Sequence, residues 1–184
     1  MASIESACAM TAYVYAGGRA AVAVIFAVAL VGKFRTRAGL ADFRDSLSRL
    51  NWLPDSLRTT AVAGVFVTEF AVVALVAHPR TAPIGLATAI AALAVFTVVA
   101  AAAMKSGTGL QCRCFGSDAG EMGASHLLRN LGIIVIAGSA LAVGVTADTA
   151  VALTPAGTVA GLCGAFLGFI LTRWDDIAYL VSRG

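Results

Sequence analysis

Charge is scarce in this chain. Of its 184 residues, 12% are charged and 59% are hydrophobic, and the mean hydropathy is +0.89. Soluble domains carry about 25% charged residues, so this composition argues against an ordinary soluble domain and indicates a membrane protein. Residues 1–18 contain no Lys or Arg. This absence argues against a cleaved signal peptide, because such a peptide begins with a basic segment.

The apolar residues fall into five blocks with few or no charges. These blocks cover roughly residues 12–32, 60–77, 84–104, 127–147 and 151–172. A helix needs about 20 apolar residues to cross a hydrocarbon core about 30 Å thick. Uninterrupted apolar blocks also lack the alternation that marks the strands of a membrane barrel. The sequence therefore predicts an all-α, polytopic membrane bundle of about five transmembrane helices, forming a single domain over residues 1–184.

The longest polar segment, residues 33–59, follows the first block. Apolar residues recur in it at spacings of three and four, with charged residues between them. They are Leu40, Phe43, Leu47 and Leu50. This spacing predicts a short amphipathic helix lying in the membrane interface, and the alternative is an ordinary linker.

Basic residues are distributed unevenly among the connections. With the N-terminus outside, eleven of the 13 Lys and Arg residues fall on the cytoplasmic side: Lys33, Arg35, Arg37, Arg44, Arg49, Arg58, Lys105, Arg113, Arg129, Arg173 and Arg183. Arg19 and Arg80 fall on the other side. Because short cytoplasmic loops carry an excess of Lys and Arg, this bias predicts an outside N-terminus and an inside C-terminus. The net charge of +3 therefore reflects topology. The sequence also lacks the interleaved basic and aromatic residues that are typical of a nucleic-acid groove.

Two thiols, Cys112 and Cys114, lie one residue apart in a glycine-rich loop over residues 105–126. Arg113, between them, favours the thiolate, which is the nucleophilic form. A Cys112–Cys114 disulfide would close a small strained ring, and strain makes such a bond easy to exchange. The alternatives are a metal site formed by Cys112, Cys114 and His126, or two inert thiols. A lone C-x-C is a weak signal compared with paired C-x-x-C sets.

Glu69 is the sole acidic residue placed well inside a predicted span. An intramembrane carboxylate is costly, indicates function by default and needs a partner. The expected partners are Arg129, from the same side of the membrane, and Arg19, from the other. The structural alternative is an ion pair, or a protonated carboxyl, that holds helices in register.

The remaining motifs of the spans are interpreted as packing. In the last span, Gly157-x-x-x-Gly161 and Gly164-x-x-x-Gly168 predict close helix packing. Cys163 is expected to pack among apolar side chains and to be inert. Cys8 lies on the side of the membrane opposite the C-x-C loop.

Several of these residues resemble a known group. Gly32-Lys33-Phe34 closing the first span, and Glu69 in the second, resemble the DoxX-like membrane proteins. Cys112-Arg113-Cys114-Phe115-Gly116 followed by His126-Leu127-Leu128-Arg129-Asn130 resembles more specifically the MauE branch, the methylamine-utilisation membrane proteins. The resemblance covers roughly residues 13–147.

The resemblance implies a redox-associated helical bundle of the bacterial inner membrane. Members of the branch assist disulfide formation or maturation of an exported dehydrogenase, alongside a thioredoxin-like partner. Carried to this chain, it makes Cys112 and Cys114 the exchanging pair, with Glu69, His126 and Arg129 as supporting residues. One implication conflicts with the charge distribution, because assistance to exported proteins places the thiols outside. The charge distribution places them inside.

The function predicted from the sequence is membrane thiol–disulfide redox chemistry through Cys112 and Cys114, supported by Arg113, Glu69, His126 and Arg129. The partners expected are the lipid bilayer and a thioredoxin-like protein. No quinone or flavin site is identifiable, so the source of electrons, a quinone or thioredoxin, stays open. The rivals are a non-catalytic accessory or assembly subunit of a larger membrane complex, and metal handling through Cys112, Cys114 and His126.

Overall fold

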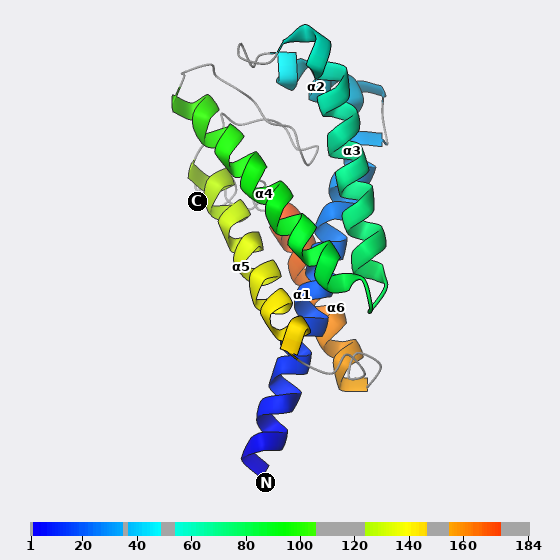
Figure 1. Cartoon of the computed structure of the whole chain (residues 1–184), viewed down its shortest axis with the longest axis vertical. Helices are drawn as coiled ribbons and strands as arrows, with labels where there is room; N and C mark the ends of the chain where they lie inside the picture. Colours follow the sequence, from blue (N-terminus) through cyan, green and yellow to red (C-terminus); the bar gives the residue numbers. More distant parts are fainter. Residues whose placement is uncertain (1, 35–36, 49–53, 106–123, 147–154, 174–184) are drawn as a thin grey trace, which may run out of the picture.

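The computed structural model describes residues 2–34, 37–48, 54–105, 124–146 and 155–173. These residues form six α-helices and contain no strand (Figure 1). The helices are α1 (Ala2–Phe34), α2 (Arg37–Ser48), α3 (Asp55–Ala77), α4 (Ala82–Lys105), α5 (Ala124–Thr146) and α6 (Pro155–Thr172). All except α2 are long and apolar enough to cross a membrane. The prediction of an all-α membrane bundle with five spans is confirmed.

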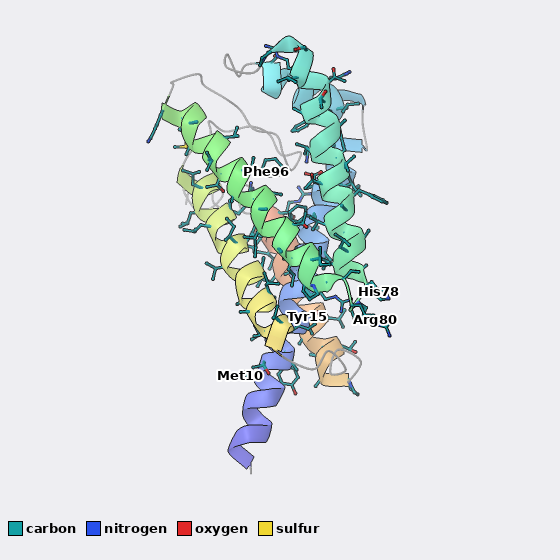
Figure 2. All side chains as sticks on the ribbon, in the orientation of Figure 1. Met10, Tyr15, His78, Arg80 and Phe96 are labelled. Atoms are coloured by element: carbon teal, nitrogen blue, oxygen red, sulfur yellow. The ribbon has the colours of Figure 1, made fainter. Side chains whose placement is uncertain are left out.

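The five spans alternate in direction, so α1, α4 and α6 run one way and α3 and α5 run the other (Figure 1). We call the end of the bundle where α1 stops and α3 begins the α2 end, because α2 lies there. The opposite end is the hairpin end, where α3 turns into α4. Figure 2 shows His78 and Arg80 of that turn far from α2. Lys105 and Ala124, which flank the C-x-C loop, both belong to the α2 end.

The central helix is α1, which packs against α3, α5 and α6. Its side chains Val22 and Ile25 are fully buried with Val72 of α3, Leu86 of α4 and Ile133 of α5. These residues belong to one hydrophobic core. The first residues of α1 extend beyond the other helices at the hairpin end (Figure 1), because the span itself begins only at Met10.

The closest helix contact joins α1 to α6, and it is built from small residues. A Cβ atom added to Gly168 would lie 2.6 Å from the carbonyl oxygen of Ala21, and one added to Gly164 would overlap the backbone of Gly17. Because residues increase in the same direction on both helices, α1 and α6 are parallel neighbours. The predicted packing is confirmed for Gly164 and Gly168, whereas a Cβ on Gly161 would meet only open space.

The turn between α3 and α4 is tight because Gly85 packs directly against Val76. A Cβ on Gly85 would approach the Val76 side chain to 2.6 Å. The Thr81 hydroxyl donates to the Leu75 carbonyl at 2.7 Å, which ties the turn to the end of α3. From this turn α3 and α4 diverge toward the α2 end (Figure 1).

The short helix α2 lies within the polar segment for which the sequence predicted an amphipathic helix. Phe43 is buried, whereas Arg44 and Asp45 are exposed, as the apolar spacing predicts. The side chain of Leu47, and all of Leu50, lie outside the described residues. A position of α2 in the membrane interface remains a prediction.

Candidate functional site

The described part of the candidate site centres on a buried ion pair between α1 and α3. Lys33 occupies the last turn of α1, and its Nζ contacts Oε1 of Glu69. Only 3% of the Lys33 side chain and 4% of the Glu69 side chain are exposed. An isolated charge in a bilayer interior is costly, so each of these two residues makes the burial of the other tolerable.

The ring of Phe43, from α2, packs on the ammonium of the ion pair, and Phe66 of α3 packs on that ring. The ring of Phe43 lies with its centroid 5.2 Å from Lys33 Nζ, in a cation–π arrangement. Phe43 also packs edge to face on Phe66 of α3, with centroids 6.2 Å apart and ring planes at 75°. Both geometries are favourable for aromatic groups. The ammonium is therefore held between a carboxylate and an aromatic face.

The second carboxylate oxygen of Glu69 is left without a donor. Oε2 is buried and accepts no hydrogen bond from any of the described residues. A buried acceptor without a partner carries a desolvation penalty of about 1–3 kcal/mol. Burying Glu69 is therefore costly, and its contact with Lys33 offsets that cost only in part.

The partner of Glu69 differs from both expected ones. Arg19 lies near the hairpin end and donates from Nε to the Val76 carbonyl at 2.6 Å and from Nη2 to the Ala77 carbonyl at 2.5 Å. It therefore satisfies carbonyls that the end of α3 leaves unpaired. Neither Arg19 nor Arg129 forms the pair, because Lys33 folds back into the bundle. A helical side chain leans toward the N-terminus of its helix, and that lean directs Lys33 inward from the end of α1.

Arg129 is nevertheless buried, at a level of the bundle close to that of Lys33. It lies on the stripe of α5 that also contains Ile133, Ala137 and Ala140 and is 8% exposed. Gly18 of α1 packs on Ala140, and Tyr15 packs on Gly144. Continuing this antiparallel register places Arg129 about level with Ala29, one helical turn from Lys33. A cationic residue of α5 thus accompanies the ion pair in the α2 half of the bundle.

A neutral polar contact joins α4 to α5 next to Arg129. Asn130 Nδ2 donates to Thr97 Oγ1 at 3.4 Å, and the Thr97 hydroxyl donates in turn to the Leu93 carbonyl at 2.7 Å. Polar groups at this depth therefore come from α1, α3, α4 and α5. They occupy the half of the bundle that lies toward the C-x-C loop.

The exchanging residues themselves, Cys112 and Cys114, and Arg113 between them, lie outside the described residues. His126 belongs to the first turn of α5, but its side chain is also outside the description. The redox and metal interpretations of these residues stay predictions. Within the described ranges, no three His, Cys, Asp or Glu side chains lie close enough to hold a metal ion.

Comparison with known protein families shows to which family the chain belongs. Residues 11–143 match the family described as Methylamine utilisation protein MauE. The chain belongs to the MauE family. Neither the curated proteins nor the solved structures gave a match.

The MauE match begins in α1 and ends in α5. It includes Lys33, Glu69 and Arg129 of the polar site, together with Cys112 and Cys114 of the predicted thiol pair. All of the residues expected to carry chemistry thus lie in the part of the chain that is MauE-like.

Outside this match, α6 carries Cys163, whose surroundings differ from those expected. Its side chain is exposed and not packed within the bundle. The reason is the glycine stripe, since α6 turns Gly157, Gly164 and Gly168 toward the bundle. Cys163 then points away from α1, toward the region occupied by lipid.

Proposed function

We propose that this MauE-family protein is a membrane thiol–disulfide redox protein that uses Cys112 and Cys114. The observation that carries the proposal is the C-x-C pair within the family match. The loop that contains it joins α4 to α5 at the α2 end, the end with the buried polar site. Arg113 favours the thiolate, which is the form that attacks a disulfide.

The proposed reaction is an exchange between this pair and a dithiol or disulfide of a thioredoxin-like protein. One thiolate attacks a sulfur of the partner's disulfide, whose S–S bond breaks as the other sulfur leaves as a thiolate. The second cysteine then attacks the mixed disulfide. A Cys112–Cys114 disulfide forms and the partner is released with two thiols, so two electrons pass to the partner. The reverse sequence oxidises the partner.

Glu69 and Arg129 are proposed as supporting residues, with His126 at the start of α5. Arg129 would contribute a fixed cation on the side of the loop, which favours a thiolate over a thiol, and Glu69 would hold the Lys33 ammonium within the bundle. Lys33 joins this group because it neutralises Glu69 within the bundle. Without it, the carboxylate would oppose thiolate formation at the same end.

The family's name links its members to methylamine utilisation, and we propose that this chain assists the maturation of a partner protein. We place the protein in the bacterial inner membrane, with the N-terminus outside and the C-x-C loop in the cytoplasm. The rival function is that of an accessory subunit without redox chemistry of its own.

The test is a comparison of single cysteine variants on non-reducing gels. With Cys112→Ser or Cys114→Ser, the exchange should stop, and one of the two should accumulate a covalent adduct with a thioredoxin-like protein because the resolving thiol is missing. Cys163→Ser is the matched control, since that thiol lies on the outer face of α6. Its exchange should equal that of the parent.

Alkylation and mass spectrometry distinguish the rivals. Redox function requires a Cys112–Cys114 disulfide that forms and is broken by reductant. Full activity of both single variants with no adduct would instead leave the accessory function. Thiols protected from alkylation only while a metal is bound would favour metal handling.

A further inference from the structure

Among the side chains of α2 that the structure describes, Phe43 is the buried one. Phe43 is 5% exposed and Leu40 is half-buried. The others, namely Ala41, Arg44, Asp45 and Ser48, are exposed. A helix of 12 residues is marginal in isolation. The contacts of Phe43 are therefore one determinant of the docked position of α2.

Phe43 contacts the ion pair itself. Lysines near the end of a membrane helix ordinarily extend toward the interface, where water solvates the ammonium. Lys33 lies in the last turn of α1, yet it is 3% exposed and pairs with Glu69. The centroid of the Phe43 ring lies 5.2 Å from its Nζ. Two groups thus favour the inward position of Lys33, namely the carboxylate that pairs with it and the aromatic face that it contacts.

We propose that α2 is a releasable cover over the Lys33–Glu69 pair, with Phe43 as the positioning residue that couples its docking to the pair. When α2 is docked, the ring directs Lys33 inward onto Glu69. When α2 lifts, Lys33 gains access to the interface. Conversely, loss of the pair withdraws the ammonium from the ring, and α2 loses this cation–π contact. Such coupling between two sites is reciprocal.

The cover lies at the α2 end of the bundle, near the helix ends that the C-x-C loop connects. It belongs to the same end as Lys105 and Ala124, which flank the C-x-C loop. A partner that displaces α2 from this end would expose a charged pair inside the bundle. The inference needs no thiol chemistry, so it stands or falls separately from the proposed function.

Hydrogen exchange of the full chain in lipid nanodiscs tests the coupling. Phe43→Leu removes the aromatic face and should raise the exchange rate of the amides in residues 37–48 by about tenfold. Glu69→Gln and Lys33→Met should raise it as well, although neither residue is in α2. The double variant Phe43→Leu/Glu69→Gln should exchange no faster than about the faster single variant, since both changes break one coupled unit.

Two conservative variants and one matched control complete the design. Lys33→Arg and Phe43→Trp keep the cation and the ring, and their exchange in residues 37–48 should stay near that of the parent. Phe70 lies one turn after Phe66 on α3 and is 65% exposed. Phe70→Leu removes this exposed ring and should leave the exchange rate of α2 unchanged. An unaltered α2 in Glu69→Gln would overturn the proposal. So would a rise spread equally over α1, α3 and α5, because that would show general loosening of the bundle.

Discussion

At the scale of single residues, the Lys33–Glu69 pair shows how a span accommodates a carboxylate. The two groups pair with each other within the described bundle, and the ring of Phe43 packs on the ammonium. Removing one member of a buried pair is far more damaging than removing both, since it leaves an uncompensated charge. This asymmetry separates a true pair from two charges that happen to be near one another.

Glu69→Leu should therefore destabilise the protein by about 3–5 kcal/mol, because Lys33 loses its counter-charge and must either stay buried unpaired or leave its site beneath α2. Glu69→Gln, which keeps a hydrogen-bond acceptor, should cost about 1–3 kcal/mol. The double variant Lys33→Leu/Glu69→Leu should recover much of the loss. Unfolding by denaturant in detergent micelles measures all three. A double variant less stable than Glu69→Leu would show that the charges do not compensate one another.

The sequence predicted that Glu69 has a polar partner, but it named the wrong one. Arg19 and Arg129 were favoured because they enter the spans from either side. What decides the pairing is the reach of Lys33 back along α1, and this depends on helix register. Spacing along a single sequence carries no register between helices. Cys112 and Cys114 lie outside the described residues, so their role remains a prediction from the motif.

At the scale of elements, the contact between α1 and α6 depends on the absence of side chains at chosen positions. Gly164 and Gly168 meet the backbone of α1, whereas Gly161 on the same helix has open space beside it. The sequence could predict that glycines at four-residue spacing pack helices. It could not tell which of them face the partner, since glycine and alanine are abundant on every side.

Two alanine substitutions on α6 should consequently have different effects on the stability of the protein. Gly164→Ala puts a methyl group into the Gly17 backbone and should destabilise the protein by about 1–3 kcal/mol. Gly161→Ala should be neutral or stabilise it by up to about 1 kcal/mol, because alanine is the better helix former. The midpoint of thermal unfolding in the same detergent compares them. Equal effects would mean that α6 does not dock on α1 through this stripe.

At the scale of the whole molecule, burial shows which basic residues count as loop charges when the orientation is predicted. Arg19, Lys33 and Arg129 lie within the bundle, so they are not loop charges. Of the ten remaining Lys and Arg residues, Arg80 alone belongs to the connection at the hairpin end. By the positive-inside rule, this distribution predicts that the hairpin end is outside and the α2 end is in the cytoplasm.

A membrane-impermeant maleimide tests this orientation in intact cells. In a Cys8→Ser/Cys163→Ser background, Cys112 and Cys114 should stay unlabelled after reduction and become labelled once the membrane is permeabilised. A cysteine introduced at Arg80 is the positive control, since that position is exposed at the hairpin end. Labelling of the C-x-C thiols in sealed cells would reverse the topology. The thiols would then face the compartment of exported proteins, as the family resemblance implied.

The parallel contact of the first span with the last also dictates the order in which the molecule can be completed during synthesis. Gly17 and Ala21 find their partners, Gly164 and Gly168, only after α2 to α5 have left the ribosome. Until then the central helix carries an uncovered strip of backbone in the membrane, although the MauE-like portion from α1 to α5 already exists. We therefore expect the insertion of α6 to cover this strip of α1 backbone during biogenesis. A chain truncated after α5 would present that strip to neighbouring proteins and to the quality-control proteases of the membrane.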